Sequence, residues 1–349
     1  MGPVLHIIDR GTPCDCLDQL ALLAGEGDRV ACVGRPPEYA GFNLPAKTVH
    51  CPFGLASLGG RRLRQFVRDG DIVHTWSPRS LQAGRMLALG GRCKLLLSLS
   101  HLPEPADLPE LLRHLSGAAL HVTLPTSVAR ERMLAAGAPC ESVHLLPPAA
   151  RPVADLPRRR QQVRAALGLA EHQRLLVAPA EMVRAAGHTY VVWAHAIVRQ
   201  IHQHVHLLIP GHGPLMKHVT YFARTTGYND EIHLTEDRFS RSDVLAAADV
   251  AAMFYQKDCG VSALVASMAA GVPVAAGDTP DAAECAPDGE AAVLAEPGSP
   301  RAATAAVLKL IDDPVLGGRL GRTAQQIAET RFSILHAKHV LGDIYGQMR

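Results

Sequence analysis

Residues 258–273 read DCGVSALVASMAAGVP, and this stretch decides the fold of its half of the chain. A helix is expected to open near Val261, and the N-terminal amides of such a helix attract anions. The apolar residues 272–276 that follow have the length of a buried strand. Asp258 places a carboxylate in the loop before the helix. The stretch therefore predicts a helix and a strand next to a loop that can hold a charged ligand.

Short apolar runs alternate with helical stretches on both sides of this segment. The runs fall at residues 4–8, 95–99, 175–178 and 205–209, and helical periodicity marks residues 17–23, 81–89 and 190–201. Strands that alternate with crossover helices form parallel sheets with both faces covered. A length of 349 residues exceeds what one core usually supports, and residues 147–152 have the Pro-rich composition of a linker. We therefore expect an α/β protein of two Rossmann-like domains, with ligands bound in a cleft at the carboxyl edges of the strands.

Composition is that of an ordinary globular protein, with 48% hydrophobic and 19% charged residues. No apolar run reaches the roughly eighteen residues of a membrane span, and the N-terminus lacks the pattern of a signal peptide. We therefore expect a cytoplasmic protein. The net charge of +2 is too small to argue for nucleic acid as a partner.

Cysteines and histidines are numerous, but their spacing does not favour a metal site. The eight cysteines lack CxxC repeats, so free buried thiols are expected. His202, His204 and His206 alternate, but no carboxylate or thiol accompanies them at ligand spacing. Solvated surface histidines are therefore expected there in preference to a metal site.

The opening stretch also resembles the signature of the retaining GT-B glycosyltransferases known as group 1 or family 4. In that family a glutamate opens the motif, and a second glutamate begins the run E-A-M-A-A-G-x-P. Here residues 268–273 match the end of that run, whereas Asp258 and Ala266 stand at the two glutamate positions. Weaker matches follow in order along almost the whole chain, at residues 6–13, 71–76, 122–136, 207–214, 242–250 and 331–345.

The resemblance implies a nucleotide sugar as donor substrate, with no metal and no other cofactor. It implies an acceptor-side domain at residues 1–150, a donor-side domain at 151–330 and a C-terminal helix at 331–349 that returns to the first domain. The candidate catalytic residues are Asp258, His74 and His101, and the candidate substrate-binding residues are Gly11, Arg184, Gly187, Gly213, Lys257, Gly260, Val261 and Glu284. A buried structural histidine is the alternative for His74 and His101, and a surface cation is the alternative for Arg184 and Lys257.

Several donor-site positions depart from the family pattern. Glu181 stands where the family has a phosphate-binding arginine, Ala186 stands at the lysine position, and Ala266 cannot accept a hydrogen bond from ribose. Residues 12–16, TPCDC, replace the family's glycine pair. Losing two charge-assisted hydrogen bonds costs roughly 3–6 kcal/mol. Arg184 and Lys257 are the candidates to compensate.

Two functions of different classes therefore stay open. One is transfer of a hexosyl group from a nucleotide sugar to an unidentified acceptor. The other is a catalytically inactive relative that acts as a binding or scaffold protein for a protein partner.

Two basic runs raise the question of further partners. They comprise Arg61, Arg62, Arg64 and Arg68, and Arg158, Arg159, Arg160 and Arg164. The second is expected to be a solvated helix start. In family relatives a basic N-domain surface can dock on anionic membrane, so for the first run a peripheral membrane contact and an ordinary packed amphipathic helix are both open.

Overall fold

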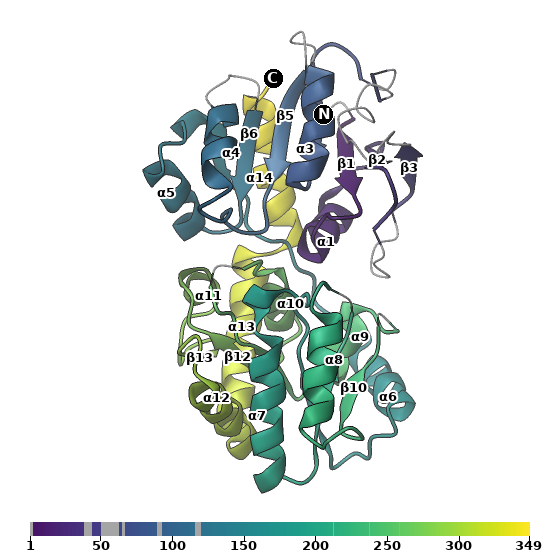
Figure 1. The fold of residues 1–349 in the computed structure, drawn as a ribbon, viewed down its shortest axis with the longest axis vertical. Coiled ribbons are helices and arrows are strands. Elements are labelled where there is room, and N and C mark those ends of the chain that lie inside the picture. The colour runs from purple at the N-terminus through teal and green to yellow at the C-terminus, as the bar shows by residue number, and fades with distance from the viewer. Residues whose placement is uncertain are drawn as a thin grey trace. The chain divides into compact units, whose positions relative to one another are not determined.

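A computed structural model describes residues 3–37, 44–49, 63–64, 67–88, 93–115, 120–211, 213–236, 238–257 and 259–349. The described residues form two compact units, which are treated one at a time (Figure 1). Unit 1 holds the residues before Ala150 together with Ile334–Arg349, and unit 2 holds Ala150–Ser333.

Unit 1 is built on a parallel sheet whose strands alternate with helices along the chain. Its strands are β1 (Leu5–Asp9), β2 (Arg29–Val33), β3 (Ala46–Val49), β4 (Asp71–Thr75), β5 (Cys93–Ser98), β6 (Leu120–Leu124) and β7 (Val143–Leu145). They are arranged in the order β3-β2-β1-β4-β5-β6-β7, and every pairing is parallel. The chain direction across the sheet reverses between β1 and β4, so ligands are expected at the carboxyl ends of these strands.

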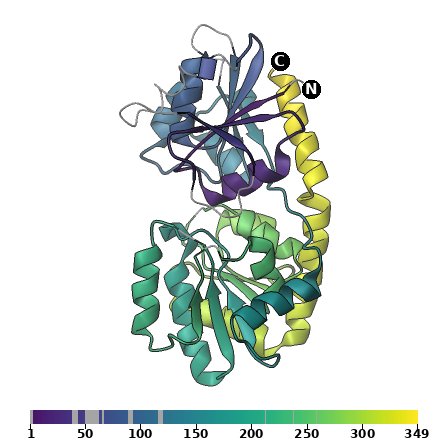
Figure 2. The same ribbon diagram turned by 90° about the vertical axis from the view of Figure 1, so that its right-hand side faces the viewer.

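Helices cover both faces of this sheet, as expected for buried parallel strands. They are α1 (Cys14–Leu23), α3 (Pro78–Ala88), α4 (Leu108–Leu115), α5 (Ser127–Ala135) and α14 (Ile334–Gln347), with a 3-10 turn at Cys140–Ser142. Figure 2 shows α14, in yellow, running alongside unit 1. The C-terminal helix thus belongs to the same unit as the first strands.

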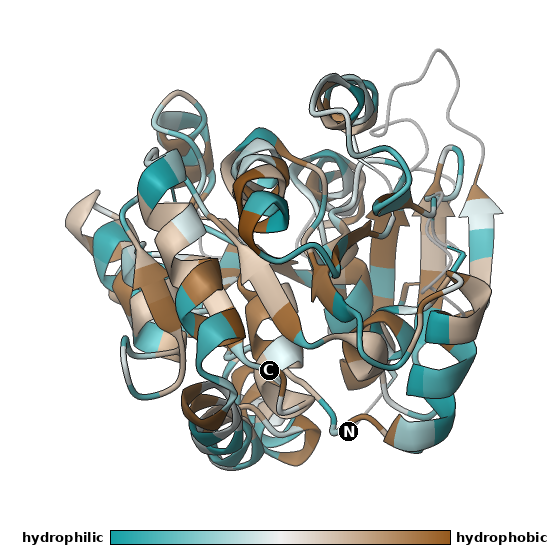
Figure 3. Ribbon diagram, turned by 90° about the horizontal axis from the view of Figure 1, so that it is seen from below, coloured by the Kyte–Doolittle hydropathy of each residue, from teal (hydrophilic) through white to brown (hydrophobic). Residues whose placement is uncertain are grey.

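Unit 2 repeats the arrangement with a second parallel sheet. Its strands are β8 (Arg174–Val177), β9 (Val205–Ile209), β10 (Ile232–Leu234), β11 (Val250–Met253), β12 (Val274–Gly277) and β13 (Val293–Ala295). The order β10-β9-β8-β11-β12-β13 places the reversal between β8 and β11. The strands are mostly hydrophobic, and a separate apolar cluster packs on each face of the sheet (Figure 3).

The helices of unit 2 include the one expected from residues 258–273. They are α6 (Leu156–Ala166), α7 (His188–Ile201), α8 (Met216–Thr225), α9 (Arg241–Ala247), α10 (Ser262–Ala269), α11 (Pro280–Cys285), α12 (Pro300–Asp312) and α13 (Pro314–Arg331), with a 3-10 turn, η4, at Arg184–Ala186. None of the helices within the described ranges is long and apolar enough to cross a membrane.

The basic run on α6 differs from the expected solvated helix start. Arg160 Nη2 lies 2.7 Å from Asp249 Oδ1, and Arg159 forms an ion pair with Asp243. Arg164 is only 6% exposed and lies 3.3 Å from the other oxygen of Asp249. The expectation was wrong for these three arginines because carboxylates on a distant segment face them. They fasten α6 to the rest of unit 2.

The alternating histidines do not gather around one point. His202 Nε2 lies 2.8 Å from Asp312 Oδ1, whereas His206 Nδ1 lies 3.2 Å from Nε2 of His233 on the neighbouring strand. Where the structure is described, no group of three or more histidine, cysteine or acidic side chains could hold a metal ion. No disulfide joins the described cysteines, but Cys140 is exposed and therefore differs from the buried thiols that we expected.

Candidate functional site

The first candidate site is the carboxyl edge of the unit 2 sheet, where the loops after β8, β9 and β11 meet. The amide of Gln256 donates to the carbonyl of Ala185 at 2.8 Å, which joins the loop after β11 to that after β8. The amide of Leu215 donates to the carbonyl of Met182 at 3.0 Å, which joins the loop after β9 to the same segment. The loops at the reversal of the sheet therefore form one connected frame.

Glycines permit the close approach of these loops. Gly187 has a φ of +70°, and a Cβ at this position would lie 1.9 Å from the carbonyl oxygen of Phe254. A Cβ at Gly213 would lie 2.6 Å from the carbonyl oxygen of Met182. Distances this short exclude any side chain unless the backbone moves. Both residues were predicted site residues, and their observed role is to let backbone pack on backbone.

The charged residues predicted for the donor site lie on or next to this frame. Arg184 begins η4, and its exposed side chain makes no hydrogen bond or ion pair within the described residues. Glu181 is half-buried, and Ala186 is 1% exposed. Lys257 is exposed on the loop after β11, and Asp258 lies outside the described residues. A cation is thus available at the frame, although not at either position where the family carries one.

The remaining predicted residues of unit 2 lie at two helix starts. Gly260 and Val261 are buried just before α10, and Val261 provides no side-chain cap to its N-terminus. Glu284 lies in α11, where its backbone carbonyl accepts a hydrogen bond of 3.1 Å from Arg331 Nη1.

His188 is a buried polar group at this frame that sequence reasoning missed. It follows Gly187 as the first residue of α7 and is 3% exposed. Burial lowers the pKa of its imidazole to about 4, so it is neutral at physiological pH. Its place directly after a glycine at the carboxyl edge of a parallel sheet is the signal that could have identified it.

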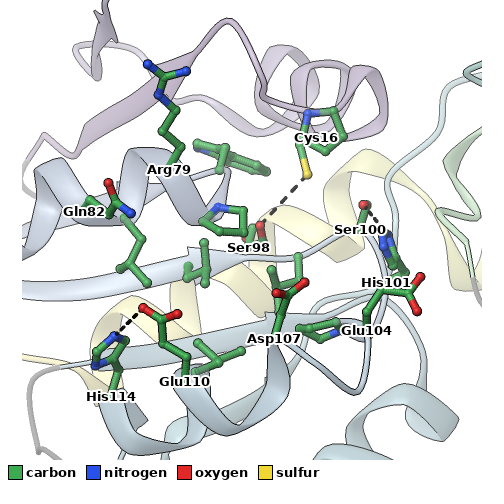
Figure 4. A pocket seen from close by; sticks show the side chains of 18 of the residues that line it. Cys16, Arg79, Gln82, Ser98, Ser100, His101, Glu104, Asp107, Glu110 and His114 are labelled. Atoms are coloured by element: carbon green, nitrogen blue, oxygen red, sulfur yellow. Dashed lines mark hydrogen bonds and ion pairs between the residues drawn. The ribbon is translucent and has the colours of Figure 1, made fainter. Parts of the chain in front are cut away.

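The second candidate site is a pocket of about 640 Å³ in unit 1. It lies at the carboxyl ends of β4 and β5, between α3 and α4 (Figure 4). Its apolar lining is Pro13, Cys16, Trp76, Pro78, Leu81, Leu97, Leu99, Pro103 and Leu111. Its polar lining is Arg79, Gln82, Arg85, Ser98, Ser100, His101, Glu104, Asp107, Glu110 and His114.

The two helices present opposite charges to this pocket. Arg79, Gln82 and Arg85 come from α3, whereas Glu110 and His114 come from α4. Arg85 Nη1 lies 2.8 Å from His114 Nε2, which in turn lies 3.6 Å from Glu110 Oε1. Hydrogen-bond donors on one wall and acceptors on the other, above an apolar floor, suit a ligand rich in hydroxyl groups.

The structure separates the two histidines predicted for catalysis. His101 lines the pocket, with Nδ1 2.9 Å from Ser100 Oγ. His74 is fully buried, and its Nδ1 and Nε2 lie 2.7 Å from Tyr345 OH and 2.7 Å from Ser98 Oγ. Burial lowers the pKa of His74 well below its usual value. This environment favours the structural alternative for His74 and leaves His101 as the acceptor-side candidate.

Gly11, the last predicted site residue, lies in the loop after β1. Its amide donates to Asp9 Oδ1 at 2.6 Å, and Asp9 also accepts a hydrogen bond from Ser77. The aspartate thus joins the loops after β1 and β4. Gly11 is exposed and does not line the pocket.

Comparison with known proteins agrees with this geometry. Residues 173–313, most of unit 2, match the family described as Glycosyl transferases group 1. The chain is 26% identical over 303 residues to a GDP-mannose-dependent α-(1-6)-phosphatidylinositol monomannoside mannosyltransferase of Mycobacterium tuberculosis, covering 79% of this chain and 77% of that protein. The match to the group 1 glycosyltransferases thus covers the part of the chain that carries the loop frame.

Solved structures extend the likeness to both units of the chain. HepE of Anabaena, in complex with UDP and glucose, is 16% identical, with a TM-score of 0.85 over 99% of this chain and 100% of that chain. Sucrose-phosphate synthase of Thermosynechococcus elongatus is 17% identical, with a TM-score of 0.76 over 100% and 99% of the two chains. At these identities the likeness establishes the fold, which is GT-B.

Proposed function

We propose that this protein is a retaining glycosyltransferase of the family 4 type that transfers a hexosyl group from a nucleotide sugar, without a metal ion, to a hydroxyl-bearing acceptor. The observation that carries the proposal is the loop frame of unit 2. Gly187 and Gly213 let the loops at the carboxyl edge of the sheet pack backbone on backbone, and ligands of parallel α/β sheets bind at this edge. HepE, which has the same fold, was solved in complex with UDP and glucose, and this supports a nucleotide sugar as the donor.

Arg184 is the phosphate ligand in this proposal. The transferred sugar leaves a nucleoside diphosphate, and without a metal its charge must be stabilised by protein groups. The Arg184 side chain is exposed on the loop after β8 and has no hydrogen-bond or ion-pair partner within the described residues. Lys257, on the loop joined to it through Gln256 and Ala185, is the second cation.

The pocket of unit 1 is the acceptor site in this proposal. Its volume of about 640 Å³ lies within the range of small-molecule sites. Arg79 and Gln82 would donate to acceptor hydroxyls, and Glu104 and Asp107 would accept from them. His101 lies among these groups and is suited to take up a proton from a hydroxyl.

A second function is favoured by a different observation at the donor edge. Glu181 brings a carboxylate to the position of a phosphate-binding cation, and Ala186 is 1% exposed and carries no charge. A protein with this edge would hold a nucleotide weakly and would act as a binding or scaffold protein.

The release of nucleotide from UDP-glucose and GDP-mannose distinguishes the two functions. The transferase should release UDP or GDP faster when hydroxyl-bearing acceptors are added, and Arg184→Ala should reduce that rate by roughly a hundredfold or more. Arg322→Ala, an exposed arginine on α13, is the matched control and should leave the rate unchanged. Absence of release from either donor across a panel of sugar acceptors would favour the inactive protein.

A further inference from the structure

Helix α7 in unit 2 is apolar on its solvent face as well as on its core face. Val191, Val192 and Val198 are buried against the sheet. On the opposite side, Trp193 is 46% exposed, Ile197 37% and Ile201 61%. These three residues are spaced four apart, so they form one stripe along about 12 Å of the helix. A helix that is hydrophobic all round is normally covered by something other than water.

The neighbouring helix α8 extends this apolar surface. Trp193 stacks on Phe222 of α8 with ring centroids 6.2 Å apart, so the stripe continues from one helix to the next. Tyr221 follows on α8 and is 70% exposed. Figure 1 shows the two helices side by side on the same side of unit 2. We call the surface made by Trp193, Ile197, Ile201 and Tyr221 the α7–α8 face.

The charges on this face are of one sign. Neither α7 nor α8 contains an aspartate or a glutamate. Lys217 and Arg224 are exposed on either side of Tyr221, and neither forms an ion pair within the described residues. Two carboxylates near the C-terminal end of α7 are already paired, Glu231 with Arg199 at 2.7 Å and Asp312 with His202 at 2.8 Å. The α7–α8 face therefore combines an apolar surface with unneutralised cations.

We propose that the α7–α8 face docks on the surface of an anionic lipid membrane. Tryptophan and tyrosine favour the boundary between headgroups and acyl chains because each combines a large apolar ring with a polar group. Isoleucine side chains enter the apolar layer, while lysine and arginine are attracted to anionic headgroups. A second copy of this chain fits less well, because a two-fold contact would place the same cations against each other.

The test is co-sedimentation of the full chain with vesicles. Vesicles containing about 30% phosphatidylglycerol should bind the protein, and pure phosphatidylcholine vesicles should bind it at least tenfold more weakly. Binding should weaken in roughly 0.5 M salt because screening reduces the attraction of the headgroups. Equal binding to both kinds of vesicle, or no binding to either, would overturn the proposal.

Variants locate the contact. Trp193→Ser with Ile201→Ser should weaken binding at least tenfold, and Lys217→Glu with Arg224→Glu should weaken it by about fivefold for each cation lost. Leu335→Ser with Lys338→Glu, both exposed on α14, is the matched control and should bind as the unmodified protein does. Thermal unfolding checks that all variants fold, which is expected because the substituted side chains are exposed.

Two further outcomes would count against a membrane. If the unmodified protein self-associates in sedimentation velocity and Trp193→Ser makes it monomeric, a second copy covers the face. If vesicle binding survives both pairs of substitutions, another surface is responsible. Either result overturns the assignment of the α7–α8 face to lipid.

Discussion

His74 Nδ1 and Tyr345 OH lie 2.7 Å apart although the two residues are separated by 271 positions in the sequence. His74 is on β4 and Tyr345 is on α14, the last helix. Their contact therefore fastens α14 to the sheet of unit 1. The second nitrogen of His74 lies 2.7 Å from Ser98 Oγ, which lies 2.7 Å from Thr123 Oγ1. Burial lowers the pKa of His74 and raises that of Tyr345, so both are neutral.

Replacing Tyr345 by phenylalanine should therefore destabilise unit 1. The change removes one hydroxyl and leaves a buried imidazole nitrogen without its partner, which typically costs about 1–3 kcal/mol. Tyr221→Phe removes the same hydroxyl from a side chain that is 70% exposed and should have no effect. Urea unfolding of the two variants measures the difference, and equal stabilities would show that the Tyr345 contact contributes nothing.

Stability should fall as the pH drops from about 6.5 to about 4. Burial lowers the pKa of His188 and of His195 to about 4, whereas the unfolded chain has the usual value near 6.5. Between pH 4 and 6.5 the unfolded state binds more protons than the folded state, so lowering the pH favours unfolding. Above pH 6.5 these histidines are neutral in both states, and they no longer reduce the stability of the fold. Free energies of unfolding at several pH values between 4 and 8 test this.

Two histidine variants test whether His195 contributes to the pH dependence of stability. His195→Gln keeps a donor for the carbonyl of Val205, which lies 3.1 Å from Nε2 in the structure, but removes the titrating group. The slope of stability with pH should therefore become shallower. His339→Gln, on a side chain that is 78% exposed, should leave the slope unchanged. An unchanged slope in His195→Gln would refute the assignment.

Gly187→Ala should damage the loop frame more than the backbone conformation alone explains. Gly187 and Gly227 both have positive φ angles, +70° and +79°, so alanine strains the backbone at each. At Gly227 no atom lies within 4 Å of the added Cβ, whereas at Gly187 the Phe254 oxygen is 1.9 Å away. Gly227→Ala should cost about 1 kcal/mol and Gly187→Ala clearly more. Similar losses for the two in urea unfolding would contradict the close packing.

UDP and GDP should bind weakly, with dissociation constants nearer millimolar than micromolar. Two cationic positions are lost at the donor edge, which corresponds to roughly two to four orders of magnitude in affinity. Isothermal titration calorimetry with the unmodified protein measures this directly. Micromolar binding would show that Arg184 and Lys257 compensate fully.

Restoring the family residues should strengthen nucleotide binding. Glu181→Arg, Ala186→Lys and Ala266→Glu together should raise the affinity by roughly a hundredfold or more, although the gains need not add at one site. Ala186 is 1% exposed, so a lysine side chain at this position fits only if the loop after β8 shifts slightly. Glu290→Arg with Ala305→Lys adds similar charges at exposed positions of unit 2 and should change nothing. A folded triple variant without gain would place the nucleotide elsewhere.

The sequence by itself determined the α/β class and the two parallel sheets. Residues 258–273 and the apolar runs are local signals, because strand and helix periodicity are properties of short segments. Gly187 and Gly213 were predicted as site residues from the family resemblance, and at both positions a Cβ would lie within 3 Å of the backbone of another loop.

Only the tertiary structure decided which polar residues are buried and what they contact. His74 lies in β4, and His101 lies in the loop after β5. Tyr345, from the far end of the chain, contacts His74 in the core, whereas His101 lines the pocket between α3 and α4. Arg160 was expected in solvent because its partner, Asp249, is 89 residues away. Burial and ion pairing depend on which distant elements pack together, and a local sequence pattern contains no information about that choice.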